Sequence, residues 1–243
     1  MRQLIAGNWK MNGLTDQATS IADALRRRVD GLGCDVLVCP PATMILTVAR
    51  LLAGSPAAVG GQDCHAEPAG AHTGDISAAM LRDAGAGWVI LGHSERRADH
   101  HETDAEVRAK VMAAGACGLI PIVCVGETEA ERQAGRHEAV VCGQLAGSLP
   151  PDFAGVVAYE PVWAIGSGKT ATESDVVAMH GCIRAELLRA LGTVGQGVRI
   201  LYGGSVKPGN ARSLLALPEV GGALVGGASL VADDFLAIAA AAH

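Results

Sequence analysis

Short apolar runs alternate with longer segments of helical periodicity along the whole chain, and this alternation constrains the fold more than any other feature. The apolar runs are rich in small or β-branched residues and are bounded by Gly or Pro, which is typical of buried strands. We therefore predict strands at residues 3–7, 35–39, 57–61, 88–91, 120–125, 156–159, 198–202 and 223–226.

Helices are predicted between these strands. Residues 15–29 place one apolar stripe on a helix, as on an amphipathic surface helix, and the stripe consists of Ala18, Ile21, Ala22, Leu25 and Val29. Residues 105–114 and 175–191 show a similar pattern, and Thr172, three residues before Asp175, predicts a helix N-cap. The Ala-rich stretch at the end of the sequence predicts a last helix.

Eight strands and eight helical stretches over 243 residues give about 30 residues per unit, the size of a βα repeat. Alternating strands and helices indicate a parallel sheet. Length and periodicity alone do not decide between a closed barrel and an open doubly wound sheet. We expect residues 1–243 to form one domain, because a barrel of this kind needs about 250 residues.

Composition excludes several classes of protein. With 49% hydrophobic and 18% charged residues the chain is globular rather than disordered, and a net charge of −6 argues against a general nucleic-acid surface. The seven cysteines have no CxxC spacing, which favours reduced thiols in the cytoplasm over a disulfide framework. We see no signal peptide and no apolar run long enough to span a membrane.

Polar and glycine residues follow five of the predicted strands, at the sheet edge where parallel sheets bind ligands. They are Asn8 and Lys10; His93, Ser94 and Glu95; Glu160; Gly203, Gly204 and Ser205; and Gly226 and Gly227. Each alone has an ordinary explanation as a surface charge, a helix start or a turn. Their joint placement predicts a site that abstracts a proton beside a carbonyl group while binding a phosphate.

Five segments, in order between residues 6 and 230, resemble the triosephosphate isomerase family. They are Ala-Gly-Asn-Trp-Lys-Met-Asn at 6–12, Gly-His-Ser-Glu-Arg-Arg at 92–97, Ala-Tyr-Glu-Pro-Val-Trp-Ala-Ile-Gly-Ser-Gly-Lys-Thr at 158–170, Tyr-Gly-Gly-Ser-Val at 202–206 and Leu-Val-Gly-Gly-Ala-Ser-Leu at 224–230. The resemblance implies an α/β fold with a single (β/α)8 TIM barrel. It also implies interconversion of dihydroxyacetone phosphate and D-glyceraldehyde 3-phosphate, without cofactor or metal.

The resemblance implies a role for each catalytic residue. Glu160 is implied to be the general base, and His93 a neutral imidazole that donates a hydrogen bond to the substrate oxygens. Lys10 is implied to stabilise the negative enediolate. Asn8 adds a hydrogen bond nearby, and Glu95 supports Lys10.

The same resemblance implies that the substrate phosphate is bound by backbone N–H groups of Gly166, Ser205, Gly226 and Gly227. We expect a short helix from residue 228 to direct its N-terminus at the anion. Residues 161–169, with an apolar tip, are expected to form a lid that excludes water from the enediolate.

Residues 62–75 align with a family loop that inserts into a partner subunit, with Thr73 at its tip, so a homodimer is implied. The sequence departs from the family here: His72 stands where Phe is typical, and Asp75 where Glu is typical. Gly221 also stands where an acidic residue is frequent, which predicts the loss of a structural ion pair.

Three further patterns have plainer interpretations. The run 168–170 resembles the end of an NTPase phosphate loop, but the required Gly is replaced by Trp163. His100, His101 and Glu102 are predicted to lie on the solvated face of a helix rather than to bind a metal. Cys124 is predicted to be a packed residue near the catalytic base, and not a nucleophile.

Two other functions stay open on the sequence. A catalytically silent barrel that binds phosphorylated ligands would keep the glycine turns, but it should lose Lys10, His93 or Glu160, all of which are present. A different isomerase, or an aldolase that uses a Schiff base, needs a lysine near a strand end on the catalytic face. Only Lys10 is placed there, inside the isomerase segment.

Overall fold

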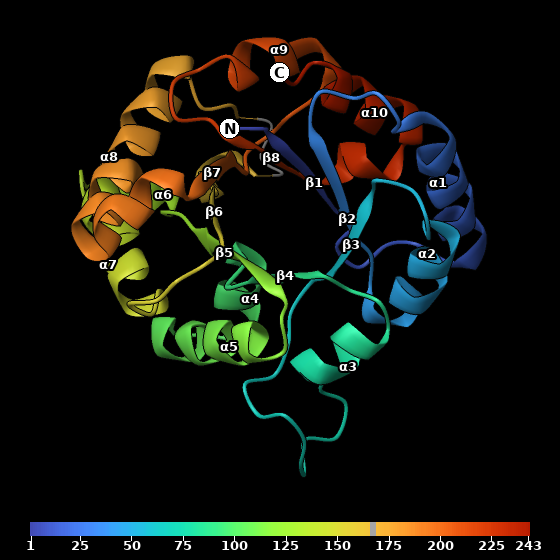
Figure 1. Cartoon of the computed structure of the whole chain (residues 1–243). Helices are drawn as coiled ribbons and strands as arrows, with labels where there is room; N and C mark the ends of the chain where they lie inside the picture. The colour runs from blue at the N-terminus through green and yellow to red at the C-terminus, as the bar shows by residue number, and fades with distance from the viewer. Residues whose placement is uncertain (166–168) are drawn as a thin grey trace.

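The computed structural model of the protein describes residues 1–165 and 169–243. Eight parallel strands form a closed barrel in the order of the sequence, and β1 (Leu4–Asn8) closes it by pairing with both β2 (Asp35–Cys39) and β8 (Gly222–Val225). Figure 1 shows the ring of strands along its axis, with the helices outside it. The predicted barrel is confirmed, and the open sheet is wrong.

The remaining elements follow in chain order. The other strands are β3 (Ala58–Gly61), β4 (Trp88–Leu91), β5 (Ile120–Val125), β6 (Val156–Tyr159) and β7 (Arg199–Tyr202). The α-helices are α1 (Thr15–Arg28), α2 (Ile45–Leu51), α3 (Ala78–Asp83), α4 (Ser94–Asp99), α5 (Asp104–Ala116), α6 (Glu129–Gln133), α7 (His137–Ser148), α8 (Glu173–Leu191), α9 (Pro208–Leu215) and α10 (Ala232–Ala240). Single 3-10 turns are η1 (Ala42–Met44), η2 (Val162–Ala164), η3 (Gly192–Gly197) and η4 (Gly227–Leu230).

Strand positions were predicted to within one residue at each end, whereas the number of helices was wrong. The described part of the chain contains ten α-helices rather than eight, because β4 and β5 are each followed by two. The additional helices, α4 and α6, have six and five residues and are too short to show helical periodicity. The predicted N-cap at Thr172 is confirmed, since its side chain accepts from the backbone N–H of Asp175. The helix expected from residue 228 is only the 3-10 turn η4.

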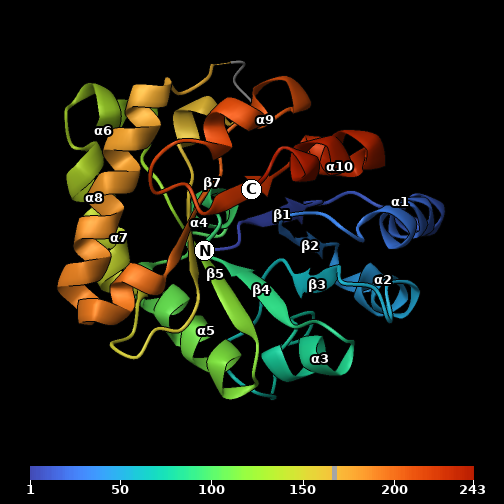
Figure 2. The same ribbon diagram turned by 45° about the horizontal axis from the view of Figure 1, so that its top comes forward.

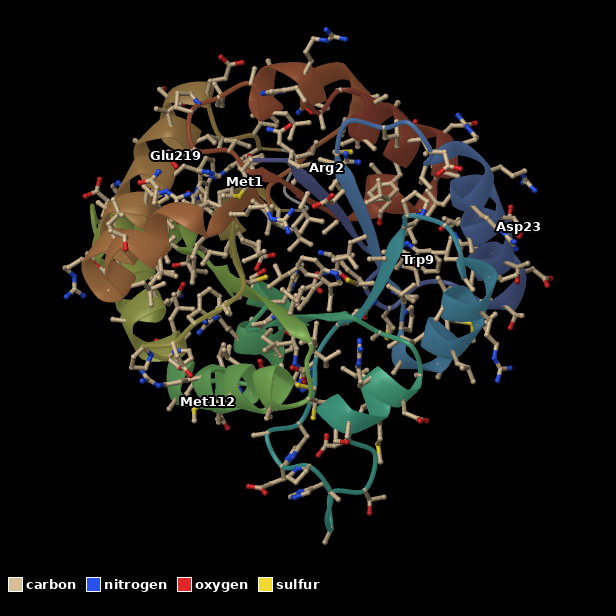
Figure 3. All side chains as sticks on the ribbon, viewed as in Figure 1. Met1, Arg2, Trp9, Asp23, Met112 and Glu219 are labelled. Atoms are coloured by element: carbon tan, nitrogen blue, oxygen red, sulfur yellow. The ribbon has the colours of Figure 1, made fainter. Side chains whose placement is uncertain are left out.

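The core has two layers, one inside the barrel and one between the strands and the helices. The inner layer consists of Leu4, Ala6, Leu37, Cys39, Ile90, Ile122, Cys124, Val156, Ala158, Leu201 and Leu224. Figure 3 shows side chains filling both regions. The strands are buried on both faces, which explains their nearly continuous apolar sequence. No helix within the described ranges is both long and apolar enough to cross a bilayer.

Barrel closure depends on a glycine at the start of β8. Gly222 has φ +141°, and a Cβ there would lie 1.9 Å from the carbonyl oxygen of Leu4 in β1. We expect Gly222→Ala to lower the free energy of unfolding by about 2–6 kcal/mol, because backbone strain and overpacking add. Urea denaturation followed by circular dichroism measures this loss.

Gly181→Ala is the matched control for Gly222→Ala. Gly181 lies in the middle of α8, and a Cβ there meets no atom within 4 Å. This exchange is expected to stabilise the protein by about 0.5–1 kcal/mol, because Ala has the higher helix propensity. Equal denaturation midpoints for the two variants would contradict the role given to Gly222.

An ion pair holds the segment that precedes β8. Arg184 Nε lies 2.7 Å from Glu219 Oε2, and the Arg184 guanidinium also donates to backbone carbonyls of η3 and of Val198. An acidic partner is therefore present two residues before Gly221. The predicted loss of an ion pair at Gly221 does not leave this segment without one.

Protonation of a buried histidine opposes folding at acidic pH. Nδ1 of His180 lies 3.0 Å from the carbonyl oxygen of Glu219, while Nε2 has no hydrogen-bond partner among the described residues. Burial lowers the pKa of His180 to about 4. The unfolded chain therefore binds this proton first, so stability is lost as the pH falls from about 6.5 to 4, by about 3 kcal/mol in total.

The measurement is the free energy of unfolding as a function of pH, for the wild type and for His180→Asn. The Asn amide can still donate to the carbonyl of Glu219 but does not titrate. We expect the variant to lose less stability than the wild type between pH 6.5 and 4. Parallel pH profiles would show that His180 does not account for the acid sensitivity.

Candidate active site

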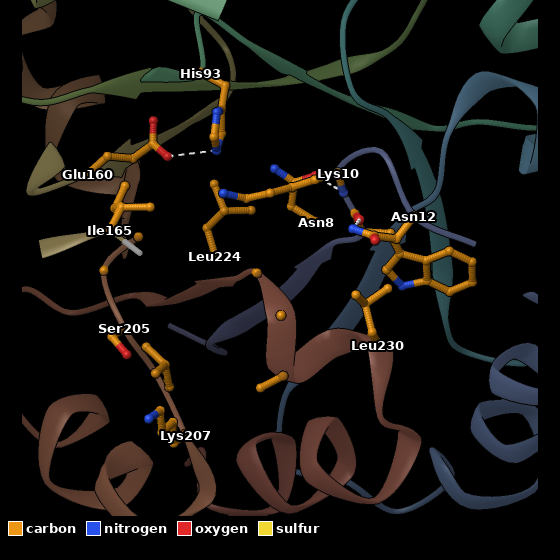
Figure 4. A pocket seen from close by; sticks show the side chains of 17 residues that line it. Asn8, Lys10, Asn12, His93, Glu160, Ile165, Ser205, Lys207, Leu224 and Leu230 are labelled. Atoms are coloured by element: carbon orange, nitrogen blue, oxygen red, sulfur yellow. Dashed lines mark hydrogen bonds and ion pairs between the residues drawn. The ribbon is translucent and has the colours of Figure 1, made fainter. Parts of the chain in front are cut away.

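A cavity of ≈ 350 Å³ opens at the carboxyl ends of the barrel strands. Seven of the predicted site residues line it: Asn8, Lys10, His93, Glu160, Ser205, Gly226 and Gly227. Figure 4 shows the side chains of Lys10, His93 and Glu160 directed into the same space. The predicted site residue Glu95 contacts Lys10 instead of lining the cavity, and Gly166 lies outside the described residues.

Glu160 follows β6 directly and is buried, with 2% of its surface exposed. Its Oε1 lies 2.9 Å from Nε2 of His93, and its Oε2 accepts a hydrogen bond of 2.9 Å from the backbone N–H of Ser94. Burial acts to raise the pKa of Glu160, but His93, the Ser94 N–H and Lys10 together lower it below the ordinary value. Glu160 is therefore a carboxylate in the free protein.

His93 is the N-cap of α4, and its ring orientation is fixed by that position. Its Nδ1 accepts a hydrogen bond of 3.2 Å from the backbone N–H of Glu95, so this nitrogen carries no proton. The proton of the neutral ring lies on Nε2, which donates to Glu160. Burial acts to lower the pKa of His93, whereas the adjacent Glu160 carboxylate raises it in the free protein. The effect of Glu160 on the pKa of His93 depends on this contact and ends when Glu160 moves away.

Lys10 reaches the cavity from a strained turn after β1. Its φ is +53°, and its backbone N–H donates to Oδ1 of Asn8 over 3.0 Å. The Nε2 of Gln62 binds the carbonyl oxygen of Lys10 over 2.8 Å and fixes the turn from the other side. The Nζ of Lys10 lies 2.5 Å from Oε1 of Glu95, which holds the ammonium near His93. The ammonium is thus positioned by contacts from three separate segments.

The opposite side of the cavity is built from main-chain turns. Gly226 and Gly227 follow β8, and a Cβ on Gly227 would meet no protein atom within 4 Å, so it would project into open space. Ser205 lies on the facing turn after β7, and the exposed Lys207 lines the same side. Backbone N–H groups at a glycine turn, together with a nearby ammonium, suit an anion.

The first part of the predicted lid is anchored by a buried carboxylate that we did not select from the sequence. Glu127 Oε1 accepts hydrogen bonds from Trp163 Nε1 over 2.8 Å and from the hydroxyl of Tyr159 over 3.1 Å. Arg132 pairs with the same oxygen and lies over the Trp163 ring. These contacts hold η2 against the barrel. Residues 166–168 of the lid lie outside the described part.

The structure places Cys124 and residues 100–102, which have plain interpretations in the sequence. Cys124 is fully buried, and burial followed by the charge of Glu160 raises its pKa well above the ordinary value, so it stays a neutral thiol. The helical placement of His100 and His101 is wrong, because α4 ends at Asp99 and His101 has φ +56°. His100 and His101 are exposed, as predicted, but Glu102 is buried and paired with Arg96 and Lys110 at 2.5 Å each.

One group of potential metal ligands occurs among the described residues. The ligand atoms of His65, His72 and Asp75 lie within 4.8 Å of one another. However, Nδ1 of His65 already accepts from the backbone N–H of Glu67 over 3.0 Å, which leaves the ring proton on Nε2. Nε2 is the nitrogen that faces Asp75 at 3.9 Å, so it offers no lone pair to a metal in this arrangement.

Comparisons with known proteins agree with this geometry. A family model described as triosephosphate isomerase matches residues 3–242. The chain is 64% identical to the triosephosphate isomerase of Granulibacter bethesdensis, with 99% of each protein covered, and 60% identical to that of Acidiphilium cryptum, with 100% and 99% covered. A crystal structure of triosephosphate isomerase from Bartonella henselae superposes with a TM-score of 0.92 at 46% identity, covering 99% of both chains. This chain belongs to the triosephosphate isomerase family.

Proposed function

We propose that the protein interconverts dihydroxyacetone phosphate and D-glyceraldehyde 3-phosphate by proton transfer through an enediolate. The observation that carries this proposal is the convergence of Glu160, His93 and Lys10 on one cavity whose far side consists of glycine turns. A base, a neutral hydrogen-bond donor and a cation lie at one end, and an anion site lies at the other. The reaction needs no redox cofactor, because the proton leaves one carbon and returns to its neighbour.

Glu160 is the base in this proposal. Its two oxygens bind His93 Nε2–H and the Ser94 N–H, and in this proposal a bound substrate displaces it from both. Displacement removes two contacts that lower its pKa, while burial, which raises the pKa, remains. The carboxylate therefore becomes more basic when substrate binds, takes a proton from one carbon, and returns it as a carboxylic acid to the adjacent carbon.

His93 and Lys10 stabilise the charge that develops on the substrate oxygens. Once Glu160 has moved, the Nε2–H of His93 is free to donate to a carbonyl oxygen, and the Lys10 ammonium lies on the same side of the cavity. A neutral imidazole is suited to this task because the Glu95 N–H blocks protonation of Nδ1. Asn8 supports the site by fixing the Lys10 backbone.

Backbone N–H groups of Ser205, Gly226 and Gly227 are proposed to bind the phosphate, with Lys207 adding positive charge at the rim. Gly166 is proposed as a fourth contact from the sequence alone. Closure of residues 161–169 over the substrate would exclude water, and Ile165 already lines the cavity. A dry cavity strengthens each of these electrostatic contacts.

The test is a coupled assay of the purified protein with each triose phosphate in turn. We expect turnover in both directions without added metal, including in the presence of a chelator. Saturable binding of inorganic phosphate without any turnover would instead support a silent phosphate-binding barrel and contradict the proposal.

We also propose a homodimer formed through residues 62–75. This loop projects from the barrel between β3 and α3 in Figure 1, and residues 67–75 are exposed. A second cavity of ≈ 520 Å³ lies at its base, beside Met11, which is 95% exposed. An equivalent loop from a second copy is the occupant we propose. Sedimentation velocity of the wild type should give twice the chain mass, and Thr73→Arg should shift the protein towards the monomer. A wild type that is fully active as a monomer would contradict the proposal.

We also propose the cellular compartment, the domain organisation and the pathway of the protein. The seven cysteines are all free thiols, which supports a reducing compartment such as the cytoplasm. Pairing of β1 with β8 places both ends of the chain in the same sheet and supports a single domain over residues 1–243. The substrate class places the enzyme in glycolysis and gluconeogenesis.

A further inference from the structure

Two cysteine thiols face each other on the outer layer of helices, away from the catalytic cavity. Cys142 lies on α7 and Cys182 on α8, and their Sγ atoms are 3.4 Å apart. The two helices lie side by side in Figures 1 and 2. Both thiols are partly exposed, whereas Cys34, Cys39, Cys64 and Cys124 are buried. Solvent-borne reagents can therefore reach this pair.

The two sulfur atoms lie close enough for a disulfide to require only a short approach. A disulfide needs an S–S distance of about 2.05 Å, so the Sγ atoms must approach by only about 1.3 Å. Packed neighbouring helices already bring the thiols into van der Waals contact. The two positions are 40 residues apart in the sequence, so a bond between them would close a long loop of the unfolded chain.

The surroundings of Cys182 hinder its ionisation. Burial raises the pKa of Cys182, and the neighbouring Cys142, Glu138 and Glu186 raise it further. Cys182 therefore keeps its proton and is not the first sulfur of the pair to react. Thiolates are the reactive form, so Cys142 is the attacking sulfur.

We propose that Cys142 and Cys182 form a redox-active dithiol that closes to an intramolecular disulfide on exposure to a low-molecular-weight disulfide such as oxidised glutathione. The Cys142 thiolate attacks one sulfur of the reagent and expels one glutathione thiolate. The Cys182 thiol then gives its proton to the glutathione thiolate already released and attacks Cys142 Sγ, which expels the second glutathione. The two cysteines are oxidised by two electrons, and one glutathione disulfide is reduced to two thiols.

Closure would join α7 to α8 without touching the cavity. The cavity lining includes neither cysteine. We therefore expect the oxidised protein to keep its activity in the triose phosphate assay. Because the bond restricts the unfolded chain, we expect it to raise the melting temperature by about 5–10 °C.

The experiment incubates the reduced protein with oxidised glutathione and measures its intact mass and its peptide map. The wild type should lose two hydrogen atoms and give one cross-linked peptide that joins residues 142 and 182. Cys182→Ser should stop at a stable glutathione adduct on Cys142. Cys117→Ser is the matched control, at another partly exposed cysteine, and should close as the wild type does.

Three results would overturn the proposal: no reaction of the wild type, a persistent glutathione adduct on Cys142 of the wild type, or a cross-link to another cysteine. Melting curves give a second readout that does not depend on mass. Oxidation should raise the melting temperature of the wild type and of Cys117→Ser, but not that of the double variant Cys142→Ser/Cys182→Ser. An equal rise in the double variant would also overturn it.

Discussion

Glu160→Gln is expected to lower kcat/KM for either triose phosphate by about 10²–10⁴-fold or more, the contribution of a general base. The amide cannot accept the proton that the carboxylate takes. Most of the loss should appear in kcat, because the exchange leaves the phosphate turns and the cavity walls unchanged. The measurement is the coupled assay under saturating and limiting substrate.

The fold of this variant needs its own check. In the wild type both carboxylate oxygens accept hydrogen bonds, one from His93 Nε2–H and one from the Ser94 N–H. A glutamine amide has only one oxygen, so its NH₂ group must face one of these donors, at a loss of about 1–3 kcal/mol. Thermal melting separates this local effect from the loss of catalysis.

Glu160→Asp is the matched control because it keeps the charge and withdraws it by one methylene. Misplacement of a catalytic group by about 1 Å can reduce the rate about 10²-fold, so this variant should retain more activity than the glutamine variant. Activity of the wild type should also fall at acidic pH, below the ordinary pKa of a glutamate, because the free enzyme holds the Glu160 pKa down. Comparable rates for wild type and Glu160→Gln would remove Glu160 from the mechanism.

The strands were predictable because each is a short, mainly buried run, and β2, β4, β5 and β6 have the predicted bounds. Closure of the barrel was not predictable from periodicity. It depends on the pairing of β1 with β8, a contact between distant parts of the sequence. The family resemblance decided this point, not the pattern of apolar residues.

The site was predicted where a side chain directly follows a strand and points into the cavity, as Glu160 does. Gln62 directly follows β3 and Glu127 lies two residues after the end of β5, but we did not select them. Their polar groups bind other parts of the protein, Gln62 the Lys10 carbonyl and Glu127 the Trp163 indole. Position after a strand therefore reveals that a residue belongs to this face. It does not reveal whether the side chain contacts substrate or supports another residue.

The wrong placement of His100 and His101 on a helix also has its cause in contacts between residues from separate elements. The sequence gives no strong stop signal after Arg97, and the end of α4 is set by contacts made in the fold. Arg96 pairs with Glu102 and Asp63, which joins α4 to the segment before α5 and to the loop after β3. Such an ion-pair network joins residues from separate elements, so no local pattern predicts it.

Lys10→Met is expected to lower kcat/KM by at least about 10²–10³-fold, the effect of removing one group that stabilises a developing anion. Met keeps an apolar stem of similar length, so the change removes mainly the charge. Without the Lys10 ammonium, the Glu95 carboxylate has lost its ion-pair partner. This carboxylate lies 3.7 Å from His93 Nδ1, so it adds uncompensated negative charge to a site that must bind an anion. We therefore expect a higher KM as well as a lower kcat.

Glu95→Gln and the double variant Lys10→Met/Glu95→Gln separate these two effects. If Lys10 acts on the substrate directly, Glu95→Gln alone should have a much smaller effect than Lys10→Met. The double variant should then recover part of the KM but little of the kcat, since the unpaired carboxylate is gone while the ammonium is still missing. A double variant as active as Glu95→Gln would mean that Lys10 only neutralises Glu95.

The same lysine distinguishes proton transfer from Schiff-base chemistry. If Lys10 is an electrostatic group, borohydride reduction in the presence of dihydroxyacetone phosphate should leave no adduct on it, and Lys10→Arg should keep more activity than Lys10→Met. The Nζ of Lys10 is already paired with the Glu95 carboxylate, so the geometry points against a Schiff base. A reduced adduct at Lys10, found by peptide mass analysis, would overturn both the isomerase mechanism and the role given to this residue.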